Sequence, residues 1–436
     1  MATIALLIEH EEGHLNPTFK LARRLAARGH RVVYAGFPDG ERYVRSQGFE
    51  FVSVGDQLFP QGTLQTQREA RAVGRVNGPV GLEALPWGDS PEALARCWQE
   101  AVCGKSLDRL MVSERPDLVL VTSFFAALAS VVRVRYGKAA GLLTPTLRRY
   151  PKLQIAASIT DLVARGLPGS AEFLRLALAA DPGLRRLQDF TDRALALREL
   201  ILCPAELEIA GEGFGHEPEV YYVEPSIDTG RLTETPFPWE RLDPGRRLLF
   251  ASLGSQSYRA GEARVLAFLT AVARAFDDRP DWQVVLSTGG LLDPAAVEPP
   301  AGGWVTAWAP QIQMLERAAA MITHGGLGTL KECLYCGVPA VVFPISHDQP
   351  DNARRIVHHG LGVAGDLESF SPAGIAALVD TADQLAVRQS VARMQQVFRQ
   401  AEEAGAGVRL LEELLPAKAG TVGHPAGSLP GWPAGL

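Results

Sequence analysis

Residues 304–352 decide the fold: Trp304-Val-Thr-Ala-Trp308-Ala-Pro-Gln311, then His324-Gly-Gly-Leu-Gly-Thr329, then Asp348-Gln349. Apolar runs at 319–323 and 338–343 precede the second and third groups. Short uninterrupted apolar runs are typical of parallel strands that are covered on both faces. Polar groups that follow such strands gather at one edge of the sheet, where ligands bind in open α/β folds. The stretch therefore predicts an α/β domain with a ligand site at that edge.

The glycine-rich turn after residue 323 leads into a helical pattern that begins at about Leu327. A strand, a glycine turn and a helix N-terminus form an anion site, because the first N–H groups of a helix have no partner within it. His324 and Thr329 add side-chain donors, and Glu332 follows on the same helix face. A carboxylate there suits a ribose diol, and Trp308 offers a flat face for a base. These parts together predict a nucleotide site.

Each of these parts also has a purely structural interpretation. The glycines suit any tight connection between strand and helix. Trp308 is compatible with core packing, and His324 with a hydrogen-bonded loop histidine. Asp348 is compatible with an N-cap of the next helix. The nucleotide prediction depends on all of them occurring together in one order.

The amino terminus predicts a second strand, turn and helix unit. Residues 2–8 form an apolar run, and helical spacing follows with Asn16 as a candidate N-cap and Pro17 in the first turn. His14 lies in the loop between them, and His10 is a loop residue or part of the lining of an acceptor pocket. A neutral imidazole can take the proton of a hydroxyl as that hydroxyl attacks. His14 is therefore a candidate general base.

Taken together, these motifs resemble the family-1 glycosyltransferases, which have the two-domain GT-B architecture. The resemblance rests on Gly13-His14-x-x-Pro17, Trp308-x-Pro-Gln311, His324-x-Gly326, Thr329, Glu332 and Asp348-Gln349. The spacing of sixteen from Trp308 to His324 is similar to that of the bacterial members. The resemblance implies an α/β fold with two doubly wound, Rossmann-like parallel-sheet domains facing a cleft.

The resemblance also implies roles at the nucleotide end of the donor. Trp308 would stack on the base with Gln311 near it, and Glu332 would hold the ribose. The diphosphate would be bound by the residues of the glycine turn and of the loop after the first strand of that domain: Ser252, Ser255, His324, Gly326, Leu327, Gly328 and Thr329.

At the sugar end, the resemblance implies that Asp348 and Gln349 hold the hexose and that His14 acts as the base. Members of the family usually carry an Asp after the strand that corresponds to residues 118–122, where it orients the histidine. Here Thr122 or Ser123 stands in that place, and Asp117 is five residues too early. We therefore count Thr122 and Ser123 as candidate catalytic residues that orient His14. The alternatives are a carboxylate from Glu11 or Glu12, or an unusually acidic acceptor such as a phenol.

Length and charge limit the classes of function. A chain of 436 residues exceeds one ordinary core, so two domains are expected. The net charge is −6, and singly scattered Lys and Arg argue against a nucleic-acid partner. Without a membrane-length apolar run or a signal-peptide pattern, we expect a cytoplasmic protein with no integral membrane segment. Five cysteines predict no disulfide framework.

No metal or cofactor is expected. Cys333-x-x-Cys336 lacks a second pair, and no Asp-x-Asp motif occurs. The helix dipole with His324 and Thr329 would take the place of a cation at the leaving diphosphate. The expected partners are a nucleotide sugar, as co-substrate, and a small hydroxylated acceptor.

The domain prediction divides the chain into an acceptor-binding domain at 1–223, a linker at 224–244, a nucleotide-sugar-binding domain at 245–415 and a disordered tail at 416–436. Residues 57–115 and 144–198 are expected to line the acceptor cleft. Its candidate apolar walls, for which core packing is the alternative, are Phe59, Trp87, Trp98, Phe124 and Phe125.

The predicted function is inverting transfer of a hexose, UDP-glucose being the expected donor, to a hydroxyl of a small natural product. The first alternative is a glycosyltransferase that uses dTDP-deoxysugars. A non-catalytic accessory protein that binds nucleotide sugars is the second, and a sugar-nucleotide 2-epimerase is the third.

Overall fold

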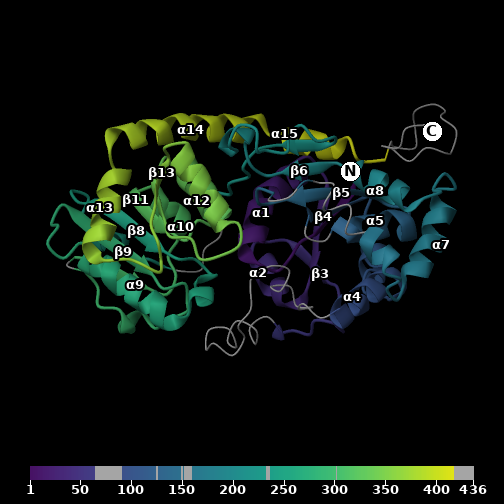
Figure 1. Ribbon diagram of the computed structural model, residues 1–436, viewed down its shortest axis with the longest axis horizontal. Coiled ribbons are helices and arrows are strands. Elements are labelled where there is room, and N and C mark those ends of the chain that lie inside the picture. Colours follow the sequence, from purple (N-terminus) through teal and green to yellow (C-terminus); the bar gives the residue numbers. More distant parts are fainter. Residues whose placement is uncertain are drawn as a thin grey trace.

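Two lobes, each built on a parallel sheet, lie side by side in this protein (Figure 1). The computed structural model describes residues 1–63, 91–123, 126–148, 151, 160–231, 236–300 and 302–416. The predicted tail at 417–436 and the wall candidates Trp87, Phe124 and Phe125 lie outside these residues.

Seven strands form the sheet of the first lobe within the described residues, in the order β3-β2-β1-β4-β5-β6-β7. They are β1 (Thr3–Leu7), β2 (Arg31–Gly36), β3 (Glu50–Ser53), β4 (Leu118–Thr122), β5 (Ala139–Thr144), β6 (Glu199–Ile201) and β7 (Val220–Tyr222). The helices around them are α1 (Glu12–Ala27), α2 (Glu41–Ser46), α4 (Pro91–Cys103), α5 (Ala126–Tyr136), α7 (Ser170–Ala180) and α8 (Leu187–Leu195). All the strand pairs are parallel, as the alternation of strand and helix patterns predicted.

The second lobe has a six-stranded parallel sheet in the described residues, in the order β10-β9-β8-β11-β12-β13. Its strands are β8 (Arg247–Ser252), β9 (Trp282–Ser287), β10 (Trp304–Thr306), β11 (Ala318–Thr323), β12 (Ala340–Val342) and β13 (Gly362–Ala364). Its helices are α9 (Glu262–Arg274), α10 (Gln311–Leu315), α11 (Leu327–Cys336), α12 (Gln349–His358) and α13 (Pro372–Ala382). The fold is thus the predicted pair of Rossmann-like α/β units.

Helix α1 begins earlier than predicted. It starts at Glu12, so Asn16 is not its N-cap, and Pro17 lies inside the helix. The backbone N–H groups of His14 and Leu15 both donate to the carbonyl of Glu11, which closes the first turn before Pro17 is reached. Asn16 instead accepts from the hydroxyl of Tyr43 at 2.6 Å. His14 therefore stands on the first turn of a helix and not in a free loop.

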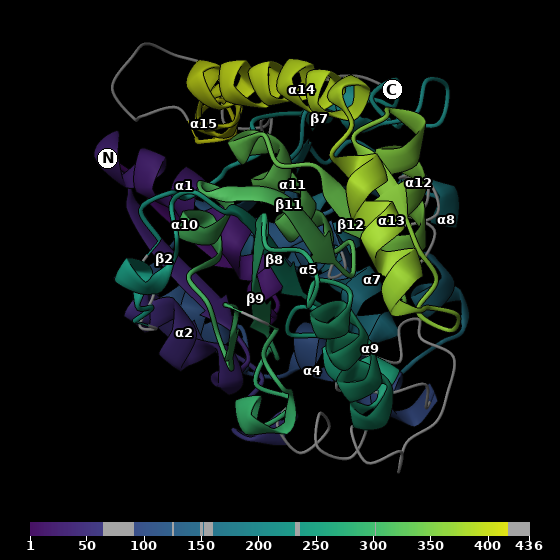
Figure 2. The ribbon, with the colours of Figure 1, turned by 90° about the vertical axis from the view of Figure 1, so that its left-hand side faces the viewer.

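The last helices cross from the second lobe back to the first. Figure 1 shows α14 (Leu385–Ala404) running along the top of the molecule to α15 (Ala406–Glu412), and Figure 2 shows α14 above the second sheet. Val408 and Leu411 of α15 are buried in a cluster with residues of α1 and the first sheet. The range 245–415 therefore includes a helix that packs on the other lobe.

Residues 224–228, the start of the segment expected to be a linker, are buried, and hydrogen bonds tie them to α1. Leu21 donates its backbone N–H to the hydroxyl of Ser226 at 3.2 Å, and Arg23 pairs with Asp228 at 3.0 Å. Lys331 of α11 is fully buried and donates to the carbonyl oxygens of Leu202 and Pro225, at 2.6 and 2.9 Å. An apolar cluster that includes Ile201 and Leu330 also spans the two lobes. The lobes are therefore packed together along this edge.

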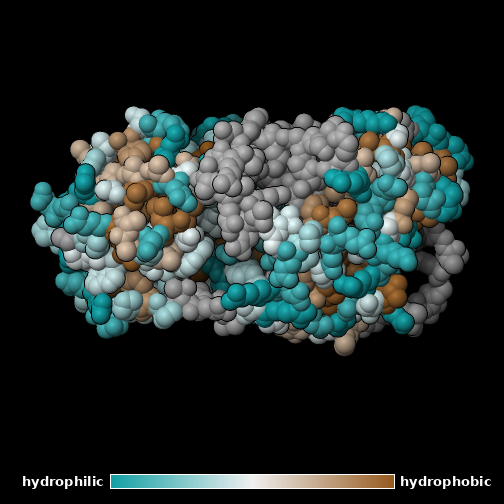
Figure 3. Space-filling view, turned by 90° about the horizontal axis from the view of Figure 1, so that it is seen from below, coloured by the Kyte–Doolittle hydropathy of each residue, from teal (hydrophilic) through white to brown (hydrophobic). Residues whose placement is uncertain are grey.

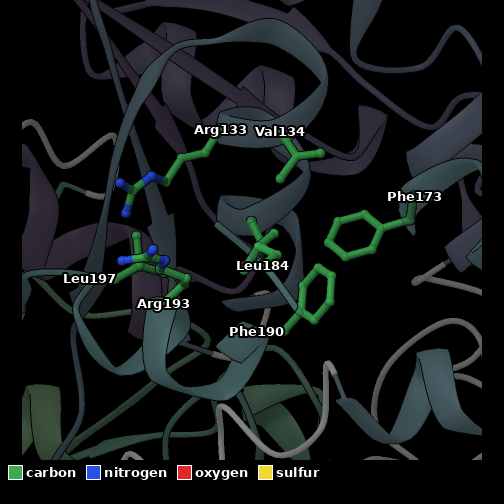
Figure 4. A pocket seen from close by; sticks show the side chains of 8 residues that line it. Arg133, Val134, Phe173, Leu184, Phe190, Arg193 and Leu197 are labelled. Atoms are coloured by element: carbon green, nitrogen blue, oxygen red, sulfur yellow. The ribbon is translucent and has the colours of Figure 1, made fainter. Parts of the chain in front are cut away.

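Phe59 and Trp98 are buried, and Trp98 packs in the core of the first lobe, where its indole N–H donates to Ser170. A shallow pocket opens in the helix layer of the same lobe, with Phe173 and Phe190 in its wall and Arg133 and Arg193 beside it (Figure 4). Its residues belong to α5, α7, α8 and the adjoining turns, so it lies apart from the strand ends that carry the predicted site.

Seen from below, apolar side chains are interspersed with hydrophilic ones on both lobes (Figure 3). In the described part of the chain, no helix is both long and apolar enough to cross a membrane.

Candidate active site

The polar edges of the two sheets meet between the lobes. A methyl group placed on Gly328 of α11 would lie 3.8 Å from the carbonyl oxygen of Gly13 in α1. Gln256, which follows β8, donates its amide N–H to the carboxylate of Glu11. The structure therefore brings the two distant motifs of the sequence together.

His14 faces a carboxylate that the sequence analysis did not assign. Its Nδ1 lies 3.5 Å from Oε2 of Glu9, and the other carboxylate oxygen of Glu9 accepts a hydrogen bond from the hydroxyl of Thr122 at 2.8 Å. Glu9 and Thr122 are both buried. Burial lowers the pKa of His14, but the carboxylates of Glu9, Glu11 and Asp348 outweigh it and raise the pKa to about 9.

Thr122 is therefore bonded to Glu9, where the sequence analysis expected a direct bond to His14. Ser123 follows β4 directly and is half-buried. One sequence signal could have found Glu9. It is a charged residue that immediately follows the apolar run at 4–8, a position at which a carboxylate is rarely buried without a partner.

The glycine turn between β11 and α11 surrounds the imidazole of His324. A methyl group on Gly326 would lie 2.7 Å from its Nε2, and one on Gly254 would lie 2.6 Å from its Cε1. Burial lowers the pKa of His324 to about 4, so the ring is neutral at ordinary pH. At these two positions the ring is approached by backbone without a side chain, which would allow phosphate oxygens to come close.

Neighbouring donors complete this loop, residues 324–329, which we call the diphosphate loop. Leu327 and Gly328 form the first turn of α11, where N–H groups lack partners within the helix. Ser252 ends β8 and accepts from the N–H of Gly254 at 3.2 Å, and Ser255 is half-buried in the turn that follows. The donor residues predicted for the diphosphate thus lie on adjoining strand ends, because β8 and β11 are paired.

Glu332 is held by two side chains. Gln311 donates to its Oε2 at 2.5 Å, and Arg231 donates to its Oε1 at 2.8 Å. The amide of Gln311 also approaches the hydroxyl of Thr329, at 3.4 Å. Arg231 lies in the segment between the lobes, and no local sequence pattern indicates that it contacts this carboxylate. Both oxygens of the predicted ribose carboxylate therefore already accept a hydrogen bond.

Trp308 has the exposure expected of a platform for a base. The residue is 42% exposed, although large apolar side chains in this protein are mostly buried. Its ring lies against Gly290, where an added methyl group would come within 2.9 Å of the indole. Core packing is therefore not its role, since backbone supports one part of the ring while much of the rest is open to solvent.

Asp348 and Gln349 begin α12. Asp348 stands at the N-cap without a capping bond, so the alternative interpretation as an N-cap side chain does not hold. Its Oδ2 accepts from Asn352 at 2.9 Å. The side-chain oxygen of Gln349 accepts from the N–H groups of Ile345 and Ser346, so only its NH₂ group could serve in the predicted contact with a sugar hydroxyl.

Backbone strain also marks this corner of the site. His347, directly before Asp348, has a φ of 60°, in the left-handed region that residues other than glycine rarely adopt. Its Nδ1 lies 2.8 Å from the hydroxyl of Ser346. Strained residues cluster at ligand sites, where the surrounding structure holds them in place.

The chain is similar in sequence and in fold to known glycosyltransferases. Residues 245–397 match the family described as UDP-glucoronosyl and UDP-glucosyl transferase. NDP-glycosyltransferase YjiC of Bacillus subtilis is 25% identical over 92% of this chain and 94% of its own length. Oleandomycin glycosyltransferase of Streptomyces antibioticus is 28% identical over 96% of this chain and 92% of its own.

Among solved structures, the glycotransferase of kitacinnamycin superposes with a TM-score of 0.68 at 25% identity, covering 95% of this chain and 99% of that one. The family match, the full-length relatives and the paired Rossmann-like sheets agree with one another. The chain is a glycosyltransferase of the GT-B fold, and it is similar to the bacterial family-1 enzymes that glycosylate natural products.

Proposed function

We propose that this glycosyltransferase moves a hexose from a nucleoside-diphosphate sugar, UDP-glucose in the first instance, to a hydroxyl of a small natural product, with inversion at the anomeric carbon. His14 is the general base. The observation that carries the proposal is the position of His14 across from the diphosphate loop: a methyl group on Gly328 of that loop would lie 3.8 Å from the carbonyl oxygen of Gly13, the neighbour of His14. The carboxylate of Asp348 also contributes to raising the pKa of His14. The relative named for oleandomycin supports a natural-product acceptor.

The chemistry follows from these positions. Trp308 and Glu332 hold the nucleoside, the diphosphate loop holds the pyrophosphate, and Asp348 and Gln349 hold the sugar. The acceptor hydroxyl approaches from the side of the first lobe, gives its proton to His14 and attacks the face of the sugar opposite the leaving nucleotide. A positioned base of this kind contributes about 10²- to 10⁴-fold to the rate. The N-terminus of α11 and the neutral His324 stabilise the departing diphosphate without a metal ion.

The charge around His14 sets the pH at which this base works. With a pKa of about 9, the ring is protonated in the free protein at neutral pH. A base must be neutral to accept a proton, so we expect kcat/KM to rise with pH and to level off near 9. A phenolic acceptor, which is itself acidic, would be less sensitive to this limit.

One observation favours the second donor class, the dTDP-deoxysugars. A ribose diol offers two hydroxyls to Glu332, but Arg231 and Gln311 already bond to both of its carboxylate oxygens. Deoxyribose has one hydroxyl fewer, so Glu332 would need to accept one hydrogen bond fewer from it. Comparing the affinities of UDP and dUDP, which differ only in the 2′-hydroxyl, separates the two donor classes.

The direct test is to incubate the purified protein with UDP-glucose or dTDP-glucose and panels of phenolic and macrocyclic acceptors. Products are weighed by mass spectrometry, and their anomeric configuration is read by NMR. We expect a β-linked hexoside from an α-linked donor. His14→Ala should lose transfer but still bind nucleotide, whereas replacing the exposed His216 by Ala should change neither. Absence of a hexosyl product with every donor, together with nucleotide binding, would favour the accessory-protein alternative.

A further inference from the structure

We propose that Glu9, fixed by Thr122, is the positioning residue that orients His14 and balances its positive charge, in place of the Asp expected after β4. This inference rests on the proposed role of His14 as the base. It assigns a function to Glu9, which lies in the turn after β1. Thr122 then acts on His14 indirectly, through Glu9.

The topology of the sheet makes this replacement possible. β1 and β4 are neighbouring parallel strands, with Leu7 opposite Val121. The residues just beyond this pair emerge at the same edge of the sheet, so a carboxylate can reach the same space from either strand. Glu9 reaches it from β1, while Thr122 ends β4 and supplies the hydroxyl.

The two carboxylate oxygens of Glu9 face different partners. Oε1 accepts from the Thr122 hydroxyl at 2.8 Å, and Oε2 faces Nδ1 of His14 at 3.5 Å. Glu9 is only 3% exposed, so water does little to screen its charge. A proton on Nδ1 directed at Glu9 leaves Nε2 as the lone pair that accepts the proton of the acceptor hydroxyl.

Charge separates Glu9 from the other candidates. When His14 takes a proton it becomes a cation, and a carboxylate nearby stabilises that cation, whereas a neutral hydroxyl cannot. Glu11 and Asp348 also act on His14, but Glu11 is bonded to Gln256 and Asp348 is bonded to Asn352. Glu9 alone of the three forms an ion-pair contact with the ring in the described residues.

Glu9→Gln tests the inference, because it keeps the shape of the side chain and removes its charge. We expect kcat on the alkaline plateau to fall by at least about tenfold, with the donor KM unchanged within about twofold. The rise of activity with pH should move down by roughly one to three units, since an attractive charge has been lost from His14. A merely structural role would not move this pH profile.

A rescue variant sharpens the test. In Glu9→Gln combined with Thr122→Asp, the carboxylate returns to the end of β4, and we expect part of kcat and the alkaline position of the profile to be restored. Thr122→Val, which removes the hydroxyl, should lose part of the rate, and Thr122→Ser, which keeps it, should lose less than Thr122→Val. Melting temperature and UDP binding serve as controls for folding.

The inference can also be tested without turnover. NMR titration of the His14 ring gives its pKa in the wild type and in Glu9→Gln, and we expect a fall of at least one unit. An unchanged His14 pKa, or wild-type kcat and pH profile in Glu9→Gln, would overturn the inference. The other outcome is a wild-type protein that binds nucleotide but transfers no sugar, while the His14 pKa falls as expected in Glu9→Gln. That outcome would count against the proposed function alone.

Discussion

Replacing Gly326 by Ala should weaken donor binding by roughly 10- to 150-fold without unfolding the protein. Gly326 has φ −59° and ψ 134°, a conformation open to any residue, so the substitution introduces no backbone strain. Its new methyl group would lie 2.7 Å from Nε2 of His324, in the space assigned to the diphosphate. His324 is buried and cannot simply turn into solvent, so the hydrogen bond proposed from its ring to the phosphate would be lost.

The magnitude follows from that lost bond. A hydrogen bond to a charged group is worth about 1.5–3 kcal/mol, which corresponds to a loss of roughly 10- to 150-fold in affinity. Gly328→Ala is the matched control, because its methyl group would lie 3.8 Å from Gly13, an ordinary contact, in the same helix turn. Calorimetric titration with UDP measures both variants. Wild-type affinity in Gly326→Ala would refute this assignment, and equal losses in both would place the effect in the start of α11.

Three further outcomes are expected. Trp308→Ala should weaken UDP binding by about 1–3 kcal/mol, the value of one base stacked on an aromatic ring, but leave pyrophosphate binding unchanged, and calorimetry compares the two ligands. Burial lowers the pKa of Lys331 to about 8, below its value in the unfolded chain. Between about pH 8 and roughly pH 10 the unfolded chain therefore holds a proton that the folded protein has lost, so the melting temperature should rise with pH over this range. Lys331→Met should remove that gain, and an identical profile in the variant would contradict it. Chelation by EDTA should leave the rate of transfer unchanged, and a loss restored by Mg²⁺ would argue against the metal-independent mechanism.

The sheets could be predicted from the sequence because parallel strands that are buried on both faces consist almost entirely of apolar residues. The apolar run at 338–343 contains β12, and the run at 319–323 falls within β11. The start of α1 was harder to place, because Pro17 resembles a first-turn residue. Only the carbonyl of Gly13 loses its usual partner to this proline, and the helix tolerates that loss near its beginning.

The donor side was predictable because its parts are local. His324, Thr329 and Glu332 lie within nine residues, and the rise and turn of one helix fix how they face. What local spacing could not show is how Glu332 is already bonded. Arg231 reaches it from the segment between the lobes, about a hundred residues away in the chain, and this contact depends on how the lobes pack.

The surroundings of His14 were harder still to predict, because the charge that a motif places at one position can be supplied by a residue at another. A motif records which residue follows which strand, but the chemistry needs only a charge at one point in space. Neighbouring parallel strands deliver their ends to nearly the same point, so a carboxylate lost from β4 can be supplied from β1 at little structural cost. Thr122 then gains a use that the motif would not suggest, because the hydroxyl left on β4 anchors the carboxylate that replaced it. The absence of the expected Asp is therefore poor ground for inferring a loss of activity in this chain, because the strand pairing places Glu9 within an ion-pair distance of His14.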